Sequence, residues 1–238
     1  MAGVIRISVV VPAFNEERLL SATLANLLRV VPEPREIIVC DNNSTDRTAE
    51  IARAAGATVV FEPLNQISRA RNRGAAAAAG EWLLFVDADS LPSKDLLEET
   101  LSAMQSNCMA GGATVEFESR DAVVRFWLAL WNSTSRVMRW AAGSYIFCEA
   151  EAFREVGGFS EALYAGEELD LFRRLKRLAR RRGKAIVILH RHPLLTSGRK
   201  ARLYSTREHL AFLLKTFLTA GRTLRRREDC SVWYDGRR

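Results

Sequence analysis

Short apolar segments alternate with amphipathic ones through the first part of the chain, and this alternation constrains the fold more than any other feature. Four segments are rich in β-branched and other apolar residues, as buried strands are: 4–14, 35–42, 57–63 and 81–89. Three segments between them have apolar residues at helical spacing or helix-capping residues: 15–30, 44–56 and 67–80. Strands that alternate with helices of this length predict a parallel sheet with right-handed crossovers.

The rest of the chain is less regular. Helices are predicted over 93–107, 121–143 and 166–183, and strands over 110–119 and 184–190. A strand and then a helix are predicted over 145–159, and the tail from residue 196 onward is expected to be helical and to lie at the surface. No linker divides the chain, so we expect a single domain over residues 1–238, whose character changes around 106–113.

Composition sets broad limits. A chain of 238 residues can bury a sizeable core, and its 48% hydrophobic and 26% charged residues are ordinary for a soluble globular protein. The four cysteines are scattered without a C-x-x-C pair, so the sequence indicates neither a zinc ribbon nor a disulfide framework. No secretory signal is visible, and no segment reaches the roughly 18–20 apolar residues that span a bilayer. We therefore expect a cytoplasmic protein.

Positive charge is unevenly distributed. The net charge is +7, and basic residues crowd into 173–184 and 221–229. Such clusters are typical of a solvated helix face, or they bind an anionic substrate or membrane surface. No helix-turn-helix, zinc or aromatic RNA-binding signature accompanies them, so we do not expect nucleic acid as a partner.

Polar residues follow three of the predicted parallel strands. They are Asn15 and Glu16, residues 41–44, and Asp87 with Asp89. In open α/β sheets, ligands bind in the crevice beyond the carboxyl ends of the strands. The topology alone therefore predicts that these three groups converge on one pocket.

Asp87 and Asp89 form a D-x-D pair at the end of an apolar strand. Paired carboxylates are hard oxygen ligands that suit Mg²⁺ or Mn²⁺, and an ion held there can also take the oxygens of a diphosphate. The alternative is structural: Asp87 caps the next turn and Asp89 is solvated.

Three other groups are candidates for chemistry. Asp41, at the end of a strand, binds a nucleobase or ribose, or else forms an N-cap or Asx-turn into the helix that follows. The acids in "GEELDL", which are Glu167, Glu168 and Asp170, supply a general base, or else only complement the helix dipole. His190, in "HRH", reaches a metal or faces solvent. The chain has no G-x-S-x-G, Walker A or G-x-G-x-x-G motif, so hydrolase, P-loop and Rossmann dinucleotide functions lack support.

Three segments taken together resemble the family 2 inverting glycosyltransferases of the GT-A fold. They are "ISVVVPAFNEERLLSATLANLL", "EIIVCDNNSTDRTAEIA" and "NQISRARNRGAAAAAGEWLLFVDADS". The likeness covers about residues 5–100 and resumes with "REVGGF" and "GEELDLFRRL". It implies an α/β GT-A fold, with a doubly wound, mostly parallel sheet and a smaller mixed acceptor-side half. The nucleotide-sugar half would cover about 5–105, the acceptor and catalytic half about 106–200, and a basic helical tail 201–238.

The resemblance also implies roles for individual residues. Asp87 and Asp89 would hold a divalent metal (Mn²⁺ or Mg²⁺) and the donor diphosphate. Glu168 stands where the family usually has an Asp as catalytic base, so Glu167 and Asp170 remain alternatives. His190 stays a candidate metal ligand. The residues expected to bind the nucleotide-sugar are Pro12, Ala13, Asn15, Glu16, Asp41, Arg69, Arg71, Asn72, Asp87, Ala88 and Arg199.

The implied reaction is metal-dependent transfer of a sugar, with inversion, from a nucleotide-diphospho-sugar to an acceptor hydroxyl. A sugar nucleotidyltransferase is one alternative, although "PAFNEERLL" has no glycine where such enzymes carry a phosphate loop. A catalytically weakened nucleotide-sugar-binding protein is another. The acceptor is open. The helix with Trp127, Trp131 and Trp140 among arginines either lies on a membrane surface, toward a lipid-linked acceptor, or is an ordinary core helix.

Overall fold

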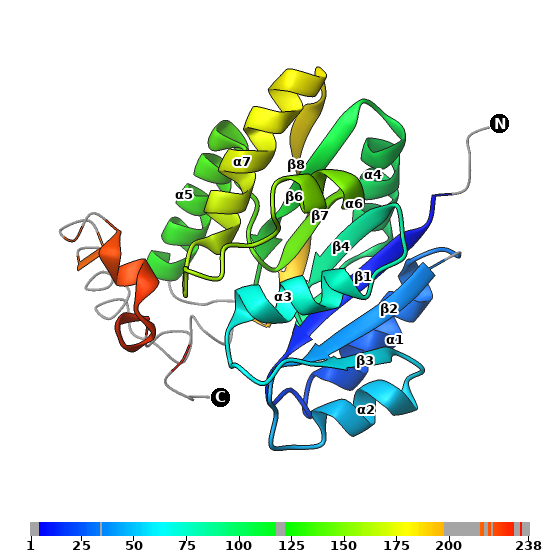
Figure 1. Cartoon of the computed structure of the whole chain (residues 1–238). Coiled ribbons are helices and arrows are strands. Elements are labelled where there is room, and N and C mark those ends of the chain that lie inside the picture. Colours follow the sequence, from blue (N-terminus) through cyan, green and yellow to red (C-terminus); the bar gives the residue numbers. More distant parts are fainter. Residues whose placement is uncertain are drawn as a thin grey trace.

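The computed structural model describes residues 5–33, 35–117, 122–197, 215–216, 219, 221–230 and 234. An eight-stranded sheet runs through the molecule in the order β3-β2-β1-β4-β7-β6-β8-β5, with helices on both faces (Figure 1). Strands from both the first and the second part of the chain belong to this one sheet.

The first part forms the parallel region that the alternating pattern predicts. Its strands are β1 (Ile7–Ala13), β2 (Arg35–Asp41), β3 (Thr58–Phe61) and β4 (Trp82–Val86). Its helices are α1 (Leu20–Val30), α2 (Thr48–Ala54) and α3 (Ile67–Ala76). β1 pairs in parallel with both β2 and β4, and β2 pairs in parallel with β3. The prediction of a mostly parallel α/β sheet is confirmed.

The second part extends the same sheet in mixed directions. Its strands are β5 (Ser90–Leu91), β6 (Cys108–Glu116), β7 (Tyr145–Glu149) and β8 (Ala185–Thr196). Its helices are α4 (Lys94–Gln105), α5 (Ala122–Met138), α6 (Ala150–Glu155) and α7 (Glu167–Arg182). β7 runs antiparallel to β4 and β6, whereas β6 and β8 are parallel. β8 continues well beyond the predicted end at residue 190, and β5, which pairs with its last residues, was not predicted.

Each central strand contributes to two hydrophobic cores, one on each face of the sheet. In β4, Leu84 lies in one core and Leu83 and Phe85 lie in the other. This alternation follows from the two-residue period of a strand, and it explains why the central strands read as continuous apolar runs. The first core is covered by α1, α2 and α4, and the second by α3, α6 and α7.

Near the C-terminus, two short 3₁₀ turns, η1 (Arg222–Arg225) and η2 (Arg227–Asp229), are described. η1 reaches the start of α7, because the backbone N–H of Tyr164 donates to the carbonyl of Leu224 (2.7 Å). Most of the predicted helical tail over 201–238 lies outside the described residues. All four cysteines are free and buried, which agrees with the lack of a disulfide pattern. Within the described ranges, no helix combines the length and the apolar character that crossing a bilayer requires.

Candidate active site

The carboxyl ends of the parallel strands meet at one edge of the sheet. Ala13 at the end of β1 pairs with Asp41 at the end of β2, which in turn pairs with Phe61 at the end of β3. β4 lies on the other side of β1 in the same direction. The polar groups that follow β1, β2 and β4 therefore leave the sheet at the same edge, as the topology predicts.

Two of these polar loops hold each other in place. The backbone N–H of Asn15 donates to Ser44 Oγ (2.9 Å), and Asn15 Oδ1 accepts from the backbone N–H of Thr45 (2.8 Å). Asn15 has a φ of 53°, a left-handed conformation that asparagine tolerates better than most residues. The backbone N–H of Glu16 donates to Thr48 Oγ1 (2.8 Å), and Glu16 is buried. The loop after β1 is thus fixed against the start of α2.

Asp41 binds the loop that follows it, through a bond to the backbone three residues on rather than the two-residue bond of an Asx-turn. Its Oδ1 accepts from the backbone N–H of Ser44 (3.0 Å), and the residue is only 7% exposed. The neighbouring Asn42 donates to the carbonyls of Glu62 (3.2 Å) and Leu64 (2.6 Å). This network holds the ends of β2 and β3 together, and a role of Asp41 toward a nucleotide stays a prediction.

Arg71 is the most buried charged residue at this edge, with 1% of its surface exposed. Its guanidinium donates to Asp87 Oδ1 (3.0 Å), to Glu167 Oε1 (2.7 Å) and to the carbonyl of Gly143 (2.8 Å). One face of the guanidinium lies over the Phe159 ring, 5.2 Å from its centroid. Arg71 therefore joins the D-x-D pair after β4 to the acidic start of α7.

The electrostatics keep Arg71 charged despite its burial. Burial alone would lower the pKa of its guanidinium, but the charges of Asp87, Glu167 and Glu168 outweigh burial and raise that pKa. Arg71 is therefore a permanent cation bound by the carboxylates of Asp87 and Glu167.

Asp89 is tied to a different element. Its Oδ2 accepts from Ser197 Oγ (2.5 Å), and its carbonyl accepts from the backbone N–H of Ser197 (3.2 Å). The adjacent pairing of Ser90 with Thr196 brings the end of β8 beside the D-x-D pair. The two acids together offer hard oxygen donors from positions i and i+2, a donor set that fits Mg²⁺ or Mn²⁺.

Two other α3 residues expected at the nucleotide bind protein groups. Arg69 forms ion pairs with Glu62 (3.0 Å) and Glu161 (2.6 Å). Asn72 forms a pair of hydrogen bonds with the backbone of Phe159, both 2.9 Å long. Their side chains thus attach α3 to the segment that leads into α7, and any contact with a donor stays a prediction.

The three acids of α7 lie in different environments. Glu167 is 5% exposed and binds Arg71, whereas Asp170 forms ion pairs with Arg174 (2.8 Å) and Arg173 (3.3 Å). Glu168 is half-buried. The helix begins after Gly166, whose φ of 71° is a conformation that glycine adopts readily.

The remaining candidates are placed as follows. Pro12 and Ala13 are the last two residues of β1 and are buried. The carbonyl of Ala88 accepts a hydrogen bond from Thr23 Oγ1 (2.8 Å). His190 is exposed in β8, with Nδ1 3.4 Å from the carbonyl of Ile188. No group of three or more His, Cys, Asp or Glu suited to a metal occurs in the described part of the chain, and metal ligation by His190 stays a prediction. Arg199 lies outside the described residues.

The structure also brings in residues that sequence reasoning missed. Glu62 directly follows β3, and Asp41 is the last residue of β2, so the strand-end rule applied to β3 identifies Glu62 as well. No sequence pattern identifies the other three, Ser197, Gly143 and Phe159. Each contacts Asp89 or Arg71 only because the fold brings it beside a residue that is distant in sequence.

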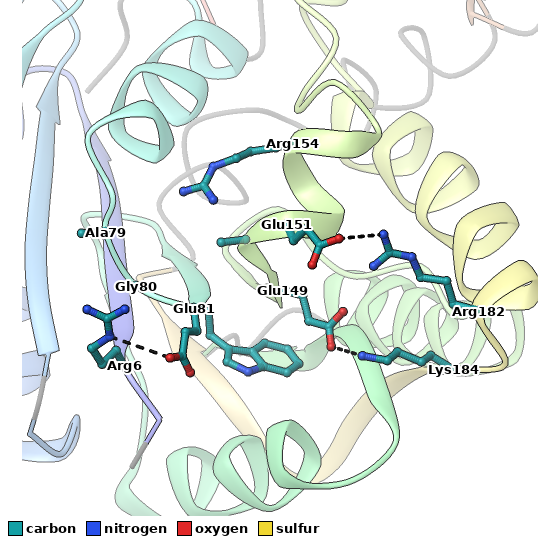
Figure 2. A pocket seen from close by; sticks show the side chains of 11 residues that line it. Arg6, Ala79, Gly80, Glu81, Glu149, Glu151, Arg154, Arg182 and Lys184 are labelled. Atoms are coloured by element: carbon teal, nitrogen blue, oxygen red, sulfur yellow. Dashed lines mark hydrogen bonds and ion pairs between the residues drawn. The ribbon is translucent and has the colours of Figure 1, made fainter. Parts of the chain in front are cut away.

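A hollow of about 490 Å³ lies at the opposite edge of the sheet (Figure 2). Six of its charged side chains form ion pairs: Arg6 with Glu81 (3.8 Å), Arg182 with Glu151 (3.0 Å), and Lys184 with Glu149. Arg154 donates instead to the carbonyl of Ala78 (3.3 Å). Because ion pairs occupy most of its charges, the carboxyl edge remains the better candidate for the active site.

The comparisons with known proteins point to one family. A model of glycosyl transferase family 2 matches residues 8–155. A validoxylamine A glucosyltransferase of Streptomyces hygroscopicus subsp. limoneus is 27% identical over 214 residues, which cover 71% of this chain and 47% of the relative. The chain thus spans about half the length of that curated relative.

Two solved glycosyltransferase structures share the fold. A mannosyltransferase from Pyrobaculum calidifontis, in complex with GDP-Man and Mn²⁺, superposes with a TM-score of 0.68 at 23% identity, over 91% of this chain and 64% of its own. The glucosyl-3-phosphoglycerate synthase of Mycobacterium tuberculosis, in complex with Mn²⁺ and UDP, superposes with a TM-score of 0.64 at 20% identity. The superposition covers 90% of this chain and 77% of the synthase chain. Both share the architecture of the sheet described above.

Proposed function

Because the chain belongs to glycosyl transferase family 2, we propose that it transfers a sugar from a nucleotide-diphospho-sugar to an acceptor hydroxyl, with inversion at the anomeric carbon. One observation carries the proposal. Arg71 touches both Asp87, in the predicted donor-side D-x-D pair, and Glu167, at the acidic start of α7. The acids expected to hold a donor and the acids expected to activate an acceptor thus lie around one residue.

The donor side of the proposal concerns the carboxyl ends of β1, β2 and β4. Asp41 and Glu16 would take the base and ribose, beside Pro12, Ala13 and Asn15. Asp87 and Asp89 would hold a divalent ion. When bound, such an ion neutralises charge that develops on the departing diphosphate. The two structural neighbours, described with GDP-Man and Mn²⁺ and with UDP and Mn²⁺, support this assignment.

The acceptor side concerns the start of α7. Glu167 is buried against Arg71, and Asp170 forms ion pairs with Arg173 and Arg174 of its own helix. We assign the general base to Glu168, the half-buried acid that stands where the family usually has its catalytic Asp. Its carboxylate would accept the proton of the acceptor hydroxyl as the hydroxyl attacks the anomeric carbon opposite the diphosphate.

The test is a screen for release of nucleoside diphosphate and for glycosylated product, using UDP-, GDP- and dTDP-sugars with Mn²⁺ or Mg²⁺. Glu168→Gln keeps the size of the side chain and removes its basicity. We expect kcat to fall by at least about 100-fold with an unchanged donor KM, because general base catalysis typically contributes that much. Asp170→Asn is the matched control, and we expect it to stay much closer to wild type.

The outcomes separate the competing assignments. A kcat of Glu168→Gln close to that of wild type, together with an inactive Asp170→Asn, contradicts the choice of Glu168 as base. It leaves the assignment as a glycosyltransferase intact. Tight binding of a nucleoside diphosphate without turnover of any donor favours a binding protein instead. Pyrophosphate release from a nucleoside triphosphate and a sugar phosphate favours a nucleotidyltransferase.

A further inference from the structure

Helix α5 exposes large apolar side chains along most of its length. Phe126 is 63% exposed and Val137 is 81% exposed. The other large apolar residues of the helix that are exposed are Val123, Trp127, Leu130 and Met138. Ordinary surface helices scatter such residues singly, whereas a continuous exposed set indicates an interaction site.

The spacing places these residues on one side of the helix. Trp127, Leu130 and Val137 follow one another at intervals of three and seven residues, which is the period of one helix face. Leu128 and Trp131 pack against the first core instead. The expectation of an ordinary core helix therefore holds for Trp131 and is wrong for Trp127, which is 42% exposed.

The charge on this helix has a single sign. Residues 122–143 contain no acid, and Arg125, Arg136 and Arg139 are exposed. At helical spacing, Arg125 and Arg136 lie on the side of α5 away from its apolar face, as basic residues do in interfacial helices. Helix α7 runs beside α5 (Figure 1) and adds Lys176, whose ammonium donates to the carbonyl of Met138 and lies 5.4 Å from the centroid of Trp140.

The basic residues of the two helices are close enough to affect one another. Burial, followed by the charges of Arg139 and Arg180, lowers the pKa of Lys176. An apolar stripe thus adjoins a concentration of positive charge contributed by α5 and α7.

We propose that α5 docks the protein on a membrane surface that contains anionic lipids, with its apolar face inserted at the boundary of headgroups and acyl chains. Apolar insertion and attraction of basic residues to anionic headgroups act together in such interfacial helices. A second copy of the chain packed through the same apolar face is the competing occupant, and the sedimentation measurement below separates it from a membrane.

The position of α5 gives docking a consequence for the candidate site. Five residues after the helix ends at Met138, the carbonyl of Gly143 accepts from Arg71, and the next carbonyl, of Ser144, accepts from the backbone N–H of Asp87 (3.2 Å). A docked α5 would hold this edge of the sheet near the lipid surface, where a lipid-linked acceptor is presented. That consequence rests on the proposed function, whereas docking itself does not.

The test is flotation of the full chain with vesicles. One set contains phosphatidylcholine alone, and the other contains equal parts of phosphatidylcholine and phosphatidylglycerol. We expect wild type to float with the anionic vesicles and to bind the neutral ones more weakly. We expect the double variant Phe126→Gln, Leu130→Gln to lose at least about tenfold in partitioning, because insertion of two large apolar side chains is removed.

The matched control is the double variant Leu28→Gln, Phe61→Gln. It removes a leucine and a phenylalanine of similar exposure, 41% and 52%, from α1 and β3. It should float like wild type. Circular dichroism melting of each variant verifies that it is folded before flotation is compared.

Four results overturn the proposal. In the first three, wild type does not float with anionic vesicles, the α5 variant floats as wild type does, or the control loses as much binding as the α5 variant. Sedimentation that shows a wild-type dimer, dissolved by the α5 variant and without flotation, overturns it in favour of self-association. Turnover measured with a soluble acceptor in the absence of lipid tests the proposed function separately. A failure of membrane docking can therefore be distinguished from a failure of the proposed glycosyl transfer.

Discussion

At the scale of single residues, a guanidinium buried between two carboxylates cannot be removed without leaving those carboxylates uncompensated. Arg71 is in this position between Asp87 and Glu167. We expect Arg71→Met to lower the free energy of unfolding by about 3 kcal/mol or more, measured by urea denaturation.

Arg69→Met is the control for this prediction. Arg69 also bridges two acids, Glu62 and Glu161, but its side chain is 31% exposed. Solvent screens its pair with Glu161, whereas Glu62 is only 5% exposed, so we expect a loss smaller than that of Arg71→Met but larger than that of a surface ion pair. Equal losses of unfolding free energy for the two variants would contradict the claim that the burial of Arg71 makes its removal more destabilising.

The cysteines give a second prediction at this scale. Burial above all raises the pKa of Cys40 to about 12 and the pKa values of Cys108 and Cys230 to about 11, and it raises the pKa of Cys148 as well. The native thiols should therefore resist a thiol reagent such as DTNB near neutral pH, and all four should react after denaturation. Rapid labelling of the native protein would contradict their burial.

The same pKa shifts determine how the stability of the fold changes with pH. A thiol whose pKa is higher in the folded state keeps its proton there after the unfolded chain has begun to lose it. Stability from these groups is therefore complete below the ordinary value of 9.0 and falls as pH rises through 11 to 12. Urea denaturation at neutral pH and at high pH measures this loss, and an unchanged midpoint would contradict it.

The partners of Arg71 were not predictable from sequence. Asp87 lies 16 positions from Arg71 and Glu167 lies 96 positions away, in an element that no local pattern connects to α3. Asp87 and Asp89 are each bound to a protein group, Arg71 or Ser197, supplied by the tertiary fold.

At the scale of elements, the close contact of α3 with β1 holds Arg71 at the sheet. A methyl group added at Gly74 would lie 2.4 Å from Cγ1 of Val10, a buried side chain. In an exposed helix Gly→Ala stabilises by about 1 kcal/mol, but here we expect Gly74→Ala to destabilise by about 1–3 kcal/mol.

A double-mutant cycle checks the cause. Val10→Ala makes room beneath Gly74, so the double variant Val10→Ala, Gly74→Ala should lose less stability than the sum of the two single variants. Strictly additive losses, measured by urea denaturation, would contradict a clash between these two side chains.

The elements of the first half were predictable because local and tertiary preferences agree there. The apolar runs that form β1, β2 and β4 are long enough to specify buried strands, and Gly56, with a φ of 80°, follows α2 as a terminating glycine does. β5 has only two residues and exists through its pairing with β8, so no pattern of its own predicts it. The antiparallel direction of β7 likewise depends on its neighbours β4 and β6.

At the scale of the whole molecule, one continuous sheet connects the two parts of the chain. β4 carries the D-x-D pair at its end, and β7 joins β4 to the strands of the second part. The acidic start of α7 reaches the same edge through Arg71. The central claim is that this edge binds a nucleoside diphosphate through a divalent ion held by Asp87 and Asp89.

Isothermal titration of UDP and GDP into the full chain, with Mn²⁺ and with EDTA, tests that claim most directly. The proteins compared are wild type, Asp89→Asn, and Asp95→Asn, whose side chain is 65% exposed on α4. We predict that wild type and Asp95→Asn bind one of the two nucleotides at least about tenfold more tightly with Mn²⁺, a difference of about 1.4 kcal/mol, and that Asp89→Asn loses this difference. Binding to wild type that is equally tight with Mn²⁺ and with EDTA, or an unchanged metal effect in Asp89→Asn, would contradict the claim.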